Sequence, residues 1–85
     1  MHRITSKNIG QKTGSRLAQH GIFTLSDLSE IGSARAYHLM QKTYPERLPY
    51  CFYLFSLEAA LLDIDWRALS TYIKNHLIHQ VHSYR

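Results

Sequence analysis

Residues 49–63 read PYCFYLFSLEAALLD, and this stretch decides the fold class of the chain. The segment is apolar on nearly every side, which is typical of a helix buried at the centre of a fold. Its aromatic first half, residues 50–55, also suits a β-strand, but the Leu- and Ala-rich continuation prolongs a helical pattern. Pro49 fits the first position of a helix. We therefore predict a central helix over residues 49–63, whose large side chains each contribute ~1.5–3 kcal/mol when buried.

The chain on both sides of this segment predicts four further short helices. Apolar residues recur with helical spacing at about 11–20, 24–31, 33–43 and 70–82. Thr24 and Asp27 have the spacing of a capping box, and Ser33 can cap the helix that follows. Gly21 and Gly32 stand where the first two helices are expected to end.

These elements predict an all-α fold, a compact bundle of about five short helices. Eighty-five residues suffice for a single domain, spanning 1–85. We expect its core over about 5–69 and a C-terminal helix over about 70–82. The connection at 21–24 is short enough to make the first two helices cross sharply, as in a helix–hairpin–helix pair.

The charge balance is compatible with an acidic partner. Ten Lys and Arg residues face six Asp and Glu residues, giving a formal net charge of +4. The basic residues are scattered, so charge alone supports nucleic-acid binding only weakly. Cys51 is the single cysteine, which excludes an internal disulfide and a multi-cysteine zinc site. The chain has no secretory segment at its start and no run of ~18 apolar residues, so we expect a cytoplasmic protein without a membrane span.

The turn Asn8-Ile9-Gly10-Gln11-Lys12 is the candidate binding site. Free backbone N–H groups at a helix start, the helix dipole and nearby cations can together hold a phosphate. Lys12 and Arg16 are one helical turn apart, and we expect both to face solvent. The candidate phosphate- or DNA-binding residues are therefore Lys7, Gly10, Gln11, Lys12 and Arg16. The alternative, that these residues only form a structural corner, stays open at this point.

No pattern in the chain indicates catalysis, a metal ion or a cofactor. The three histidines of residues 76–82 lie on one arc of a helix, but no Cys, Asp or Glu stands among them, which favours a solvated face over a metal site. Glu58 is expected on a narrow exposed face or paired with Arg35 or Arg67. Nucleophile, P-loop and dinucleotide motifs are absent from the sequence. We therefore predict a protein that is not an enzyme and has no catalytic residues, metal or cofactor.

Four motifs follow one another over about 5–69. They are Asn8-Ile9-Gly10-x-Lys12, Leu17-Ala18-x-x-Gly21-Ile22-x-Thr24-x-x-Asp27-Leu28, Ile31-Gly32-x-x-x-Ala36-Tyr37 and Leu57-Glu58-x-Ala60-Leu61-x-x-Ile64-x-Trp66. In this order they resemble the C-terminal domain of the TfoX/Sxy family. Full-length members of that family regulate natural competence for transformation in bacteria and carry an α/β domain before this one. The resemblance implies an all-helical domain related in shape to helix–hairpin–helix and SAM-like folds. It also implies a part in controlling DNA-uptake genes, alongside a cyclic-AMP-responsive activator.

Two functions follow as expectations. The first is a regulatory module in transcriptional control that contacts DNA through its phosphate backbone, without sequence preference. The second is a protein-interaction domain that docks onto a transcription factor, a polymerase or another domain and makes no DNA contact. A homodimer formed through the same surface is a variant of the second.

Overall fold

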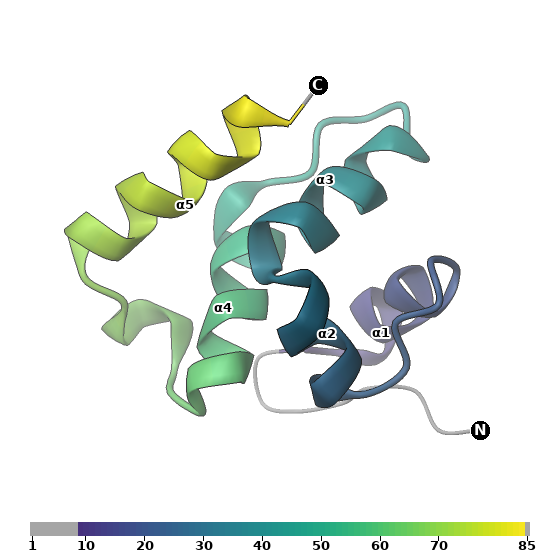
Figure 1. Cartoon of the computed structure of the whole chain (residues 1–85), viewed down its shortest axis with the longest axis horizontal. Coiled ribbons are helices and arrows are strands. Elements are labelled where there is room, and N and C mark those ends of the chain that lie inside the picture. Colours follow the sequence, from purple (N-terminus) through teal and green to yellow (C-terminus); the bar gives the residue numbers. More distant parts are fainter. Residues whose placement is uncertain (1–8, 85) are drawn as a thin grey trace.

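Helix α4, Phe55–Leu62, lies at the centre of the fold in the computed structural model, which describes residues 9–84. Figure 1 shows α4 between α5 (Thr71–Ser83) on one side and α2 (Leu25–Ile31) with α3 (Ser33–Lys42) on the other. Leu57 of α4 is fully buried. The predicted central, buried helix is confirmed.

The first turn of this helical segment is wider than predicted. Residues Tyr50–Leu54 form a π-helical turn, η1, before α4 begins. Pro49 precedes that turn in an extended conformation, with φ −61° and ψ 138°, so it is not the first helical residue that the sequence predicted. The Ser56 hydroxyl donates to the Cys51 carbonyl at 3.1 Å, so a side chain also satisfies an oxygen of the widened turn.

The remaining elements are α1 (Gln11–Ala18) and a short 3-10 helix, η2 (Trp66–Ala68). Residues 9–84 contain these helices and no strand element, which confirms the all-α fold and the bundle of about five short helices. The relation to helix–hairpin–helix and SAM-like folds stays a prediction. Within the same residues, no helix is both long enough and apolar enough to cross a membrane.

The apolar core draws side chains from all five α-helices. α3 and α5 pack side by side, as Figure 1 shows, and α2 packs on both α3 and α4. The fully buried large side chains are Ile9, Leu17, Ile22, Leu28, Met40, Leu48, Leu54 and Leu57. Each helix is too short to be stable alone in water, so burial of these side chains is what holds the helices in place.

A single residue joins α2 to α3. The Gly32 N–H donates to the Leu28 carbonyl at 2.7 Å, and the Gly32 carbonyl accepts from the Ala36 N–H at 3.0 Å. Its φ of 89° and ψ of 148° lie in a region that essentially only glycine adopts. The prediction that Ser33 caps α3 is wrong, because Ser33 is already inside the helix and its hydroxyl points to Glu58 instead.

The predicted capping box at the start of α2 is confirmed. Thr24 Oγ1 accepts from the Asp27 N–H at 3.0 Å, and Asp27 Oδ2 accepts from the Thr24 N–H at 3.2 Å and from the Phe23 N–H at 2.9 Å. The predicted left-handed conformation of Gly21 is also confirmed, with a φ of 79°, although α1 itself ends at Ala18, before the predicted residue 20.

This box makes stability depend on pH. Hydrogen bonds from the backbone of Phe23 and then of Thr24 lower the pKa of Asp27 below its usual 3.8. Because the folded state has the lower pKa, the contribution of the box is complete above about pH 4 and is lost as pH falls through the folded value. We expect the difference in free energy of unfolding between the wild type and Asp27→Asn to shrink on acidification, as measured by urea unfolding at several pH values.

The matched control is Glu30→Gln, which removes an exposed carboxylate of the same helix that takes no part in the box. A difference between the wild type and Asp27→Asn that stays constant down to about pH 2 would contradict the assignment.

Candidate functional site

The start of α1 keeps the features that could receive a phosphate. Gly10 is the N-cap residue, with φ −79° and ψ 176°, and as a glycine it has no side chain to cap the helix. The first turn contains no acidic residue, and Gln11 and Lys12 are exposed. The first backbone N–H groups of a helix have no partner within it, and the exposed Lys12 lies beside them. Lys7 lies outside the described residues.

Arg16 does not share this surface. We expected its side chain to face solvent, and that expectation is wrong, because Arg16 is only 7% exposed. Its guanidinium carbon lies 4.0 Å from the ring centroid of Tyr44 and 5.2 Å from that of Tyr53. Arg16 Nη2 is also 3.8 Å from Glu46 Oε1. A guanidinium stacks well on aromatic faces, so Arg16 connects α1 to the segment that contains Tyr44 and Tyr53. A phosphate contact by Arg16 would need an exposed guanidinium, which is lacking here.

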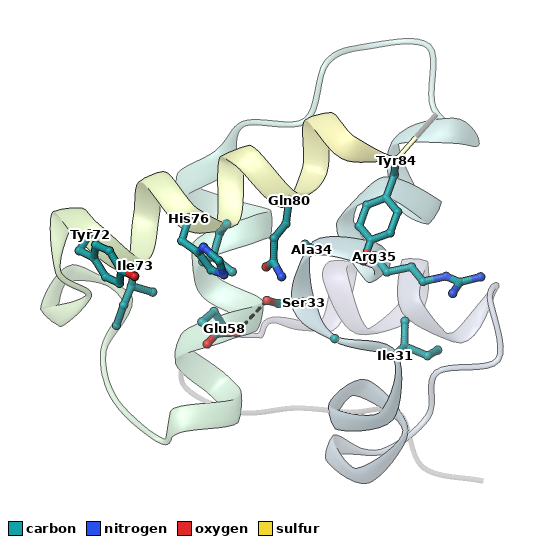
Figure 2. A pocket seen from close by; sticks show the side chains of 12 residues that line it. Ile31, Ser33, Ala34, Arg35, Glu58, Tyr72, Ile73, His76, Gln80 and Tyr84 are labelled. Carbon is teal, nitrogen blue, oxygen red and sulfur yellow. Dashed lines mark hydrogen bonds between the residues drawn. The ribbon is translucent and has the colours of Figure 1, made fainter.

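A hollow of about 390 Å³ opens between the α2–α3 joint, α4 and α5 (Figure 2). The Ser33 hydroxyl donates to Glu58 Oε1 at 2.7 Å within it. The sequence suggested that Glu58 lies on an exposed face or pairs with Arg35 or Arg67. Neither expectation holds among the described residues, because Glu58 is half-buried and bonds to Ser33 instead. Figure 2 shows the Arg35 side chain directed away from the carboxylate, and Arg67 instead pairs with Asp65 at 2.8 Å.

The chain matches the family model of the TfoX C-terminal domain over residues 2–81. It belongs to the TfoX C-terminal domain family. No curated protein and no solved structure matches the chain. The match takes in α1 to α4 entirely and nearly all of α5, so the resemblance read from the four motifs is confirmed.

The three histidines of α5 in this TfoX C-terminal domain lie in different environments. His76 lines the hollow of Figure 2 and stacks with the Tyr72 ring at a centroid distance of 6.4 Å. His82 instead reaches Tyr50, with Nε2 at 3.1 Å from the hydroxyl. His79 is exposed. Over residues 9–84, no three His, Cys, Asp or Glu side chains gather closely enough to hold a metal ion.

Proposed function

We propose that this TfoX C-terminal domain is a regulatory module in the control of DNA-uptake genes, and that it acts by binding rather than by catalysis. Membership of the family supports the regulatory role. We further propose that it contacts the DNA backbone without reading sequence. The observation that carries this step is the exposed start of α1, which has no capping side chain and bears Lys12.

The chemistry of that surface suits a phosphate. A helix start carries roughly half a positive charge, and a Lys ammonium beside it adds a full one. Contacts of this kind position a protein on a duplex and carry no sequence information. With Arg16 stacked in the interior, the site consists of Gly10, Gln11 and Lys12.

Titration of duplex DNA at several salt concentrations tests the proposal. Each phosphate neutralised contributes about −0.9 to the slope of log affinity against log salt. We expect Lys12→Gln to weaken binding and to make that slope shallower by about 0.9. The reason is that one Lys–phosphate contact is lost while α1 is kept.

The matched control is Gln19→Glu, which changes the net charge by the same amount at the exposed far end of α1. It is expected to leave the salt slope unchanged. Equal effects of the two substitutions would mean that only net charge matters, and absence of binding at low salt would remove the DNA contact altogether.

The hollow of Figure 2, between the α2–α3 joint, α4 and α5, favours a second function, which is docking onto a protein. Tyr72 stands at its edge with 79% of its surface exposed. Aromatic side chains presented beside a concave surface are typical of protein contacts. Failure of DNA to bind at low salt, together with capture of a purified transcription activator, would support this function in place of the first.

A further inference from the structure

Three hydrogen-bonding side chains meet at the end of the molecule formed by loop 43–49 and the C-terminal end of α5. Arg47 Nη2 donates to the Tyr50 hydroxyl at 3.2 Å, and that hydroxyl lies 3.1 Å from His82 Nε2. The Arg47 guanidinium carbon is also 5.4 Å from the Tyr50 ring centroid. Figure 1 shows the loop and the end of α5 close together at the top of the view.

These groups are accessible and keep unused donors. Arg47 and His82 are exposed, and Tyr50 is half-buried. An Arg guanidinium has five N–H donors, of which the Tyr50 hydroxyl receives one here. In the hydrogen bond between the Tyr50 hydroxyl and His82 Nε2 one group donates to the other, so this pair and the guanidinium together can still donate to the oxygens of one anion.

Among the described residues, none of those that line the hollow beside these groups is acidic. The hollow encloses about 400 Å³ and is lined by Tyr37, Gln41, Pro45, Arg47, Tyr50, Val81 and His82. The carboxylate of the loop, Glu46, lies instead near Arg16, with 3.8 Å between Oε1 and Nη2. An anion entering the hollow therefore meets donors and apolar surface without a repelling charge among the lining residues.

The loop is held in place without any ligand. The Gln41 amide donates to the Glu46 carbonyl at 2.8 Å and accepts from the Leu48 N–H at 2.7 Å. The buried Tyr37 hydroxyl donates to the Leu48 carbonyl. Burial and the neighbouring Tyr50 raise the pKa of Tyr37, so this phenol keeps its proton. A loop fixed in this way presents Arg47 at little ordering cost on binding.

The loop end of the fold carries basic side chains beside one carboxylate, that of Glu46. Lys42, the exposed last residue of α3, precedes the loop and adds positive charge near Arg47. The carboxylates Asp27 and Glu30 lie in α2, and Asp63 directly follows α4. In Figure 1 the start of α2 and the end of α4 lie at the bottom, opposite the loop. The end that bears Arg47 therefore offers positive charge to a polyanion.

We propose that Arg47, Tyr50 and His82 bind a phosphate group of the DNA backbone. The proposal rests on the DNA contact proposed above and adds a second, independent contact built on other elements. The planar fork of Arg47 suits two phosphate oxygens, and the hydrogen-bonded pair of phenol and imidazole supplies a further donor beside it. The site contacts a phosphate and no base edge, so it contributes affinity without sequence preference.

Duplex DNA titrated into the full chain tests the site through Arg47→Gln. We expect the slope of log affinity against log salt to become shallower by about 0.9. The matched control is Arg67→Gln, which makes the same chemical change on η2, where Arg67 pairs with Asp65. That control is expected to keep the wild-type slope. Equal slopes for the two variants, with wild-type DNA binding intact, would overturn this site and leave the contact at Lys12 standing.

Inorganic phosphate, titrated at constant ionic strength, distinguishes the source of the phosphate. We expect NMR shifts of the Tyr50 and His82 ring signals in the wild type and in Arg67→Gln, and none in Arg47→Gln. If these shifts occur but no duplex binds at low salt, the DNA source is wrong and the site takes free phosphate. If neither phosphate nor DNA affects these signals, the site itself is wrong.

Discussion

Replacing Arg16 by alanine is expected to lower the free energy of unfolding by about 2–4 kcal/mol, well above the ~1 kcal/mol typical of point substitutions. A desolvated cation–π contact contributes ~2 kcal/mol or more, and Arg16 stacks on both Tyr44 and Tyr53. Truncation also removes the buried aliphatic stem that packs there, because the residue is only 7% exposed. The expected loss is therefore one of tertiary structure around α1.

Urea unfolding followed by circular dichroism measures this loss. The matched control is Lys12→Ala, which truncates an exposed basic side chain of the same helix and is expected to change stability by less than about 0.5 kcal/mol. Equal destabilisation by the two variants would contradict the structural role of Arg16. The same pair tests the binding site, since only Lys12→Ala is expected to reduce the salt dependence of DNA binding.

Gly32→Ala is expected to destabilise the fold by about 1–3 kcal/mol, the cost of holding a non-glycine residue in a sparsely populated backbone region. The space around the residue is not the reason, because a Cβ placed at Gly32 would meet no atom within 4 Å. The backbone is the reason, since φ is 89° and ψ is 148°. Relaxing those angles would disturb the hydrogen bonds to Leu28 and Ala36 on either side.

Thermal unfolding compares this variant with Gly10→Ala. Gly10 also has no atom within 4 Å of an added Cβ, but its φ of −79° is open to any residue. We expect Gly10→Ala to change stability by only a few tenths of a kcal/mol, because two effects oppose each other. Alanine is less favourable than glycine at an N-cap, but it also lowers the conformational entropy of the unfolded chain. A small effect at both glycines would show that the joint relaxes freely.

Local patterns predicted the parts of the fold that neighbouring residues determine. The capping box at Thr24 and Asp27, the left-handed turn at Gly21 and the central position of α4 depend on residues within one or two turns. The π-helical turn before α4 was missed, because the sequence of residues 50–54 suits an α-helix equally well.

Contacts between segments far apart in the sequence could not be predicted from the helical spacing of apolar residues. Ser33 and Glu58 are separated by 25 residues, and Tyr50 and His82 by 32. Amphipathic spacing on α1 assigned Arg16 to solvent by residue type alone, and only the position of Tyr44 and Tyr53 shows why a guanidinium is buried there. The exposure of Lys12 depends on local helix geometry, and for that reason it was predicted correctly.

The single-residue joint at Gly32 leaves the α2–α3 corner no freedom in chain length. An α-helix advances by about 100° per residue, so one residue inserted at the joint would turn every later position of α3 to a new side. Arg35, now exposed, would take the place of the fully buried Ala36. The one-residue joint therefore fixes which side of α3 faces the core, whereas a longer loop would accommodate an extra residue without rotating the helix.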